Sequence, residues 1–134
     1  MNADSRAEDV LRDTRRIAIV GASPNPGRPV FDVMRYLIEA GFEVIPVRPG
    51  GGEILGQQVV ASLAEIQGRI DLVNVFRAGD AAPDIAREAV SVGAGALWLQ
   101  PGCLSDEARE IASTAGLAFV DRECTMHVHR QMNP

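Results

Sequence analysis

The chain has 134 residues, which suits one domain and leaves little room for a second. Its net charge of −5 argues against a nucleic-acid binder with a generally basic surface, and no apolar run approaches the ~20 residues of a membrane span. The polar amino terminus shows no signal peptide, and two cysteines without a disulfide framework indicate a reducing, cytoplasmic setting.

The predicted elements alternate between helix and strand along the chain. A short helix is expected within Asn2–Arg15. Five strands follow it: Ile17–Val20, Phe42–Val47, Ile70–Phe76, Ala96–Leu99 and Leu117–Val120. Three helices separate them: Val30–Ala40, a helix capped by Asp80 and ended by Gly93, and a helix capped by Ser105 that runs to Ala115. Residues 122–134 are expected to form a polar tail.

This alternation is typical of a parallel sheet with helices on both faces. Right-handed crossovers leave few topologies, and we expect a Rossmann-like α/β sandwich of three layers over residues 1–134, in one domain. Its mainly parallel, five-stranded sheet is predicted to have the order 3-2-1-4-5. Pro46 lacks the N–H that a central strand needs, so pairing is expected to be lost near it.

The segment Ile17–Pro29 reads as a buried strand, a turn at Gly21 and the start of a helix. Pro29 suits the first helical turn, where its missing N–H costs nothing. Backbone N–H groups of such a turn point at one spot, with the positive end of the helix dipole behind them, which makes a phosphate site. The spacing is not G-x-G-x-x-G, so a plain strand-to-helix turn is the alternative interpretation.

Ligands of such sheets bind beyond the carboxyl ends of the strands. An NAD-binding domain normally places Asp or Glu about 20 residues past the glycine loop, whereas this chain has Arg48 there. A guanidinium favours a nucleotide with an extra ribose phosphate, which both NADP and coenzyme A carry. Arg48 as a solvated surface charge is the alternative.

Three further residues are candidates for ligand contacts in the same crevice. Arg28 lies inside the phosphate turn and is the best partner for a pyrophosphate. The chain has no lysine, so its arginines are the side chains that can pair with phosphates. Phe76 can cover an adenine or belong to the core. Gln100 can orient a polar ligand group or make loop hydrogen bonds only.

The order and spacing of six runs resemble the small stand-alone CoA-binding proteins, which are similar to the N-terminal domain of the succinyl-CoA synthetase alpha subunit. The runs are Ile19–Pro24, Arg28-Pro29, Val44–Pro49, Asp71–Arg77, Ala96–Gln100 and Asp121-Arg122. The resemblance implies a Rossmann-like fold with CoA bound across the strand ends. It also implies phosphate contacts from Gly21, Ala22, Ser23, Asn25 and Arg28. Arg48 would lie near the 3′-phosphate, and Phe76 and Arg77 near the adenosine.

Catalytic and metal-binding patterns are weaker. Cys103 precedes a helix, where a thiol pKa can be lowered, but an inert loop cysteine is the better interpretation. Cys124, His127 and His129 offer three ligands without a fourth of clear spacing, and no metal is predicted. Ser23 has no evident His–Asp partners, so no catalytic residue is assigned.

Two functions of different classes remain. The favoured one is a non-catalytic module that binds coenzyme A or an acyl-CoA. The alternative is an oxidoreductase or redox-sensing domain of the NADP-binding type, which the missing substrate domain disfavours. Whether the protein forms a homodimer or has another protein partner is left open.

Overall fold

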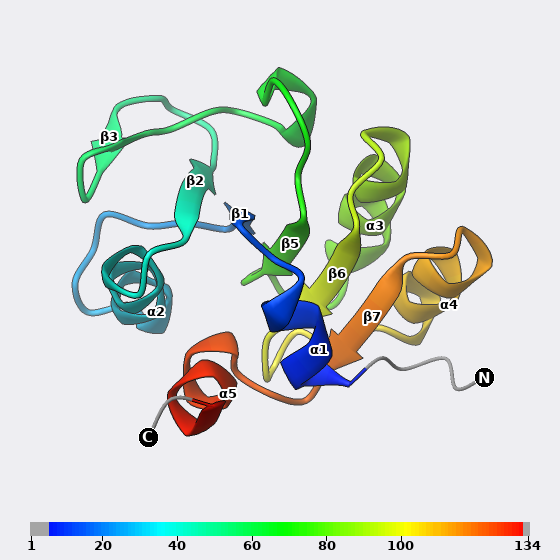
Figure 1. The fold of residues 1–134 in the computed structure, drawn as a ribbon. Coiled ribbons are helices and arrows are strands. Elements are labelled where there is room, and N and C mark those ends of the chain that lie inside the picture. Colours follow the sequence, from blue (N-terminus) through cyan, green and yellow to red (C-terminus); the bar gives the residue numbers. More distant parts are fainter. Residues whose placement is uncertain (1–5, 133–134) are drawn as a thin grey trace.

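A computed structural model describes residues 6–132 of the chain (Figure 1). The five main strands are β1 (Arg16–Val20), β2 (Glu43–Val47), β5 (Leu72–Val75), β6 (Ala96–Leu99) and β7 (Ala118–Asp121). The helices are α1 (Ala7–Arg12), α2 (Pro29–Glu39), α3 (Ala82–Ser91), α4 (Asp106–Thr114) and α5 (Thr125–Met132). The connection from β2 to β5 contains the two-residue strands β3 (Glu53–Ile54) and β4 (Gln57–Gln58) and the 3-10 turn η1 (Leu63–Glu65).

The main sheet lies between two layers of helices, as Figure 1 shows. Successive residues of a strand point to opposite faces, and β1 follows this rule. Ile17 and Ile19 belong to the core formed with α1, α2 and α5, while Ala18 and Val20 belong to the core formed with α3 and α4. The strands are therefore apolar on both faces, and the predicted three-layer α/β architecture is confirmed.

All neighbouring strands of the sheet are parallel, in the order β2-β1-β5-β6-β7. Counted along the five predicted strands this order reads 2-1-3-4-5, so Ile70–Phe76 lies beside Ile17–Val20 and not beside Phe42–Val47. The outer edge of β2 is taken by Val60, which forms a single parallel bridge with Val47. The chain then passes β2 and β1 and forms β5, which pairs with β1 on the side away from β2.

Pro46 does not interrupt the pairing of β2, contrary to the prediction. It lies in register with Ile19 of β1, and its carbonyl accepts a hydrogen bond of 3.0 Å from the N–H of Val60 on the outer edge. In a parallel strand the nitrogen and carbonyl of one residue face the same neighbour. The missing N–H of Pro46 is therefore on the outer edge, where β1 does not need it.

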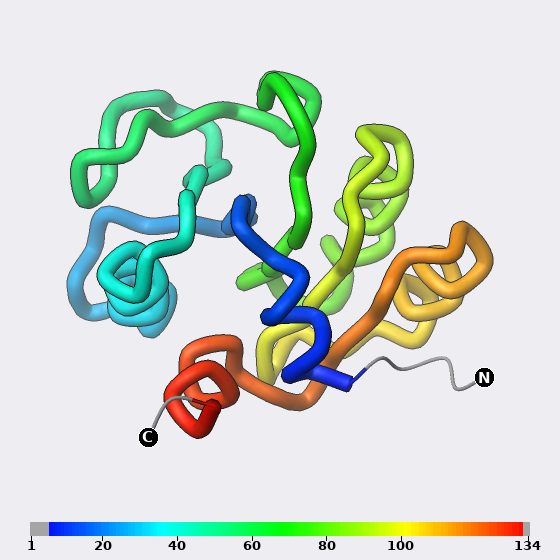
Figure 2. Tube along the Cα trace, viewed as in Figure 1, coloured from blue at the N-terminus to red at the C-terminus, as the bar shows by residue number. Residues whose placement is uncertain are grey.

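Most of the segment expected as a polar tail, residues 122–134, is helix α5. Thr125 and Val128 are buried, and the hydroxyl of Tyr36 in α2 lies 2.8 Å from Nδ1 of His129. The helix packs against both α1 and α2, and Figure 2 shows its red tube beside them. α5 thus covers the part of this sheet face that α2 does not cover.

The amino-terminal helix and the helix starts were predicted in part. α1 is shorter than the expected helix within Asn2–Arg15, and residues 2–5 of that prediction lie outside the described residues. Ser105 caps α4, since its Oγ accepts a hydrogen bond of 3.1 Å from the N–H of Ala108. Asp80 does not cap α3, which follows Ala81 and has no side-chain cap. Within residues 6–132, no helix is long and apolar enough to cross a membrane.

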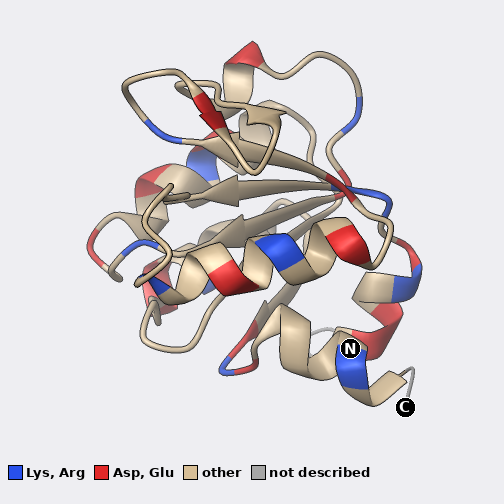
Figure 3. Cartoon of the chain, turned by 90° about the vertical axis from the view of Figure 1, so that its left-hand side faces the viewer, with Lys and Arg blue, Asp and Glu red and all other residues tan. Residues whose placement is uncertain are grey.

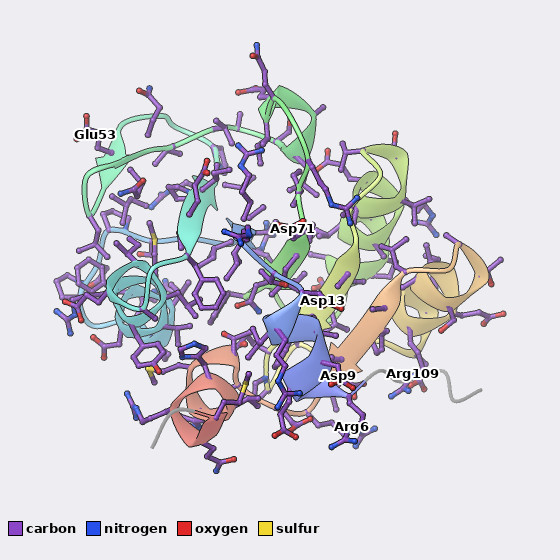
Figure 4. The ribbon with its side chains drawn as sticks, viewed as in Figure 1. Arg6, Asp9, Asp13, Glu53, Asp71 and Arg109 are labelled. Carbon is purple, nitrogen blue, oxygen red and sulfur yellow. The ribbon has the colours of Figure 1, made fainter. Side chains whose placement is uncertain are left out.

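Asp71 ties the beginnings of β1 and β5 together at the end of the sheet opposite the glycine turn (Figure 4). Its Oδ2 accepts hydrogen bonds from the backbone N–H groups of Arg15 and Arg16, at 3.0 and 2.9 Å, and its Oδ1 accepts one of 2.9 Å from Nε of Arg69. Partial burial raises the pKa of this carboxyl, but the three donors outweigh burial and hold the pKa below its ordinary value of 3.8.

We therefore expect Asp71→Asn to lower the free energy of unfolding at pH 7 by about 1 to 3 kcal/mol, since charge-assisted hydrogen bonds are lost. A lowered pKa in the folded state stabilises the fold above the unfolded pKa and ceases to do so as the pH falls through the folded value. The difference between wild type and variant should shrink below pH 4. Urea unfolding from pH 7 to pH 3 measures it, and a constant difference would contradict this role.

Candidate functional site

The turn after β1 requires glycine at position 21. Gly21 has φ +92°, and its N–H donates a hydrogen bond of 3.1 Å to the carbonyl of Val47. A Cβ atom there would lie 2.8 Å from the carbonyl oxygen of Phe76, which follows β5. The close approach brings the carboxyl ends of β1 and β5 together, and the Arg77 side chain packs beside it, with its Cδ 3.1 Å from the place of that Cβ.

The residues after Gly21 shape a compact turn through their own side chains. Ser23 Oγ accepts a hydrogen bond of 3.1 Å from the N–H of Asn25, and Asn25 Oδ1 accepts one of 2.9 Å from the N–H of Gly27. Arg28 then directly precedes α2, which begins at Pro29. Within the described residues, the N–H groups of Ala22 and Ser23 donate to no protein acceptor. Together with the start of α2 they form an array of free donors.

Two cavities lie on either side of this turn, and both include Gly21, Ser23 and Arg28 in their walls. The first, of about 440 Å³, is here called the apolar cavity. Its other walls include Val30, Val33, Phe76, Gln100, Cys103, Cys124 and Met126. The second, of about 390 Å³, is here called the arginine cavity. Its other walls include Ala22, Arg48, Ser62, Arg77, Ile85 and Glu88.

The guanidinium groups at the arginine cavity are available for an anion. Within residues 6–132, Arg28, Arg48 and Arg77 have no carboxylate partner within 4.0 Å, whereas Arg87 forms ion pairs of 2.7 Å with Asp84 and Glu107. Arg28 and Arg77 are exposed and Arg48 is half-buried. Figure 3 shows that basic and acidic residues lie mostly on the helices and on the connecting segments.

Gln100 is held in the wall of the apolar cavity by a buried polar network. Its Oε1 accepts hydrogen bonds of 3.1 Å from both the backbone N–H of Thr125 and Nδ2 of Asn74, and the Thr125 hydroxyl donates to Asn74 Oδ1 at 3.0 Å. A backbone N–H can only donate, so the contact with Thr125 assigns the oxygen of the Gln100 amide. The network joins β5, the segment after β6 and the start of α5.

The cysteine and histidine candidates do not form a metal-binding group, although Cys103, Cys124 and His127 all line the apolar cavity. Burial raises the pKa of the Cys103 thiol. A position just before a helix can lower a thiol pKa, so the shift is opposite to the one that the sequence position allowed. His127 lines the apolar cavity, whereas His129 points to Tyr36 of α2. Among residues 6–132, no group of three or more His, Cys, Asp or Glu side chains could hold a metal ion.

The structure thus brings eight of the nine candidate residues to the walls of the two cavities. Asn25 is the exception: it holds the turn and lines neither of them. Phe76 and Arg77, which were expected together near one adenosine, lie in different cavities. Sequence reasoning missed the walls supplied by α5 and the partners of Gln100. The Thr125, Val128, Met132 spacing of i, i+3, i+7 was the available signal for α5.

Fold and site together define a Rossmann-like α/β domain whose carboxyl edge carries a glycine turn between two cavities. The chain belongs to the CoA binding domain family, whose family model matches residues 15–130. The resemblance to small stand-alone CoA-binding proteins is therefore confirmed.

Relatives of two kinds support this assignment. The chain is 37% identical over 131 residues to the uncharacterized protein YneT of Bacillus subtilis, covering 96% of this chain and 97% of that protein. It is 33% identical to the solved structure of a hypothetical protein from Pyrococcus horikoshii, with a TM-score of 0.93, covering 98% of this chain and 95% of that one.

Larger enzymes contain a similar region. The ADP-forming acetate–CoA ligase of Methanocaldococcus jannaschii is 24% identical over 129 residues, which are 89% of this chain and 18% of the ligase. The solved structure of a dinucleotide-forming acetyl-coenzyme A synthetase from Ca. Korarchaeum cryptofilum has a TM-score of 0.72 at 18% identity, covers 83% of this chain and 26% of that one, and shows the shared fold. This chain spans about a fifth to a quarter of these enzymes.

Gly21→Ala should lower the free energy of unfolding by about 1 to 3 kcal/mol, the usual cost of one strained backbone position. The contact of the new Cβ with the Phe76 carbonyl should add to this loss. Gly27→Ala is the matched control in the same turn: its Cβ would lie 3.2 Å from Asn25 Oδ1, a looser contact with a side chain instead of backbone, and its φ is not positive. Urea unfolding compares the two. Equal losses would show that the contact at position 21 is not limiting.

Proposed function

We propose that this protein binds coenzyme A or an acyl-CoA across the carboxyl ends of its strands, without catalysing a reaction on it. Family membership supports CoA as the ligand. The observation that carries the proposal is the turn with free N–H donors between a cavity with arginines and a cavity with apolar walls. CoA has the same succession of parts: a phosphorylated adenosine, a pyrophosphate and a longer, uncharged pantetheine arm.

In this proposal the pyrophosphate lies over the turn. The N–H groups of Ala22 and Ser23 donate to its oxygens, and the positive end of the α2 dipole lies behind them. Arg28 adds a charge-assisted contact from the rim of both cavities. Gly21 allows the backbone to approach the phosphates, and Asn25 holds the turn in the required shape.

The adenosine and its 3′-phosphate occupy the arginine cavity. Arg48 is half-buried and without a carboxylate partner in the described part of the chain, so it can pair with the 3′-phosphate. Arg77 lies across the adenosine, where a guanidinium can stack on a base. Phe76 then contacts the ligand on the other side of the turn, where the pantetheine arm begins, and Gln100 lies farther along the apolar cavity.

The state of Cys103, which follows Gln100 by three residues, supports binding without catalysis. The raised pKa of Cys103 keeps it protonated at neutral pH, and the thiolate is the nucleophilic form. The CoA ligand is proposed to be drawn from the cytoplasm, with no nucleic acid or membrane as partner. A homodimer or a second protein that receives the ligand is compatible with this role.

Arg48→Ala should weaken CoA binding about tenfold to a hundredfold, since a hydrogen bond to a charged group is lost. The same variant should bind dephospho-CoA as the wild type does, because that ligand lacks the 3′-phosphate. Isothermal titration calorimetry measures both affinities. Arg12→Ala is the control: this exposed arginine of α1 pairs with Asp9 at 3.0 Å, away from the turn, and should leave binding unchanged.

Arg28→Ala should instead weaken CoA and dephospho-CoA by the same factor, because both carry the pyrophosphate. It should do so with little change in melting temperature, since Arg28 is exposed and has no ion pair to a described residue. If wild type binds NADP but not CoA, the proposal is wrong and an NADP-type redox function replaces it. Unchanged CoA affinity in Arg28→Ala would remove the pyrophosphate role.

A further inference from the structure

Besides the donors of the turn and the Arg28 guanidinium, the wall of the apolar cavity contains an oriented side-chain amide that has no acceptor for its N–H among the described residues. Gln100 is 5% exposed, and its Oε1 is fixed by Thr125 and Asn74. Its amide nitrogen Nε2 therefore points away from the network, and in the described residues it has no acceptor. No described side-chain nitrogen or oxygen that is fully buried lacks a partner, so Nε2 is not fully buried, and Gln100 lines the apolar cavity.

Most of the rest of this wall is apolar, although Arg28 and His127 also line the cavity. Val30 and Val33 of α2 face the cavity from one side, and Cys124 and Met126 of the α5 region close it from another. Its carboxylate, Asp32, is exposed and accepts a hydrogen bond of 2.9 Å from Arg35. Apart from the turn, Arg28 and His127, the cavity thus offers one side-chain amide N–H, held in place by its network, beside apolar side chains. The complementary ligand group is a carbonyl oxygen attached to a short alkyl chain.

Resting on the proposed CoA function, we propose that the apolar cavity holds the acyl end of an acyl-CoA, and that Gln100 Nε2 donates a hydrogen bond to the thioester carbonyl oxygen. Free CoA ends in a thiol, whose sulfur is only a weak acceptor for this donor. The protein then distinguishes acylated from free CoA by one hydrogen bond and by the apolar contacts of the acyl chain. Asn74 and Thr125 act as positioning residues, since they hold the amide and do not touch the ligand.

The amide carbonyls of the pantetheine arm are the competing acceptors for Gln100, and every CoA ligand carries them. The test therefore compares acetyl-CoA with S-ethyl-CoA, which has a methylene in place of the thioester carbonyl and is otherwise the same molecule. Calorimetry on the wild type should show acetyl-CoA binding about threefold to tenfold more tightly, the usual net effect of one hydrogen bond. Equal affinities, or tighter binding of S-ethyl-CoA, would overturn the proposal.

Variants of Gln100 locate the effect. Gln100→Met keeps the length of the side chain and removes the donor, so the preference for acetyl-CoA should disappear while S-ethyl-CoA still binds. Gln100→Glu keeps an oxygen for Thr125 and Asn74 and serves if the methionine variant does not fold; at a pH where its carboxyl is ionised it cannot donate, and acetyl-CoA should lose its advantage. A preference that persists in a folded variant would overturn the role of Gln100.

These outcomes separate the two proposals. If CoA binds more tightly than dephospho-CoA but acetyl-CoA and S-ethyl-CoA bind equally, the CoA function holds and the acyl proposal fails. If no CoA ligand binds at all, the CoA function itself fails.

Discussion

Gly21 meets the carbonyl of Phe76 so closely that a Cβ atom would lie 2.8 Å from its oxygen, and the site depends on this contact. It lies between β1 and β5, the neighbouring strands from which the chain departs to opposite faces of the sheet, to α2 and to α3. Such a switch point leaves a crevice at the carboxyl ends of parallel strands. Gly21 itself contributes no side chain to this crevice, and it lines both cavities.

The far wall of the apolar cavity comes from the carboxyl-terminal part of the chain. Trp98 Nε1 donates a hydrogen bond of 2.7 Å to the carbonyl of Glu123, and the first N–H of α5, that of Thr125, donates to Gln100. These contacts hold the start of α5 against the end of β6, and α5 also packs against α2. The segment 124–126 therefore both supplies part of the cavity wall and orients the Gln100 amide.

Much of the fold follows from local patterns in the sequence. The apolar run Ile17–Val20 predicts a strand buried on both faces, and Ser105 predicts the start of α4. The strand order does not follow from such local patterns. The residues around Val60, which forms a single bridge at the edge of β2, show no periodic pattern. α5 was missed because Thr125 is a polar residue at a buried position. Candidate residues of the turn were found from their types, whereas the separation of Phe76 from Arg77 depends on how two consecutive side chains leave a strand, which composition does not reveal.

The central claim is that one CoA molecule lies across the Gly21 turn, with its adenosine in the arginine cavity and its acyl or thiol end in the apolar cavity. A crystal structure of the protein with bound acetyl-CoA tests it most directly. We expect the pyrophosphate within hydrogen-bond distance of the N–H groups of Ala22 and Ser23, and the 3′-phosphate beside Arg48. Adenosine in the apolar cavity, or CoA bound away from the turn, would contradict the account.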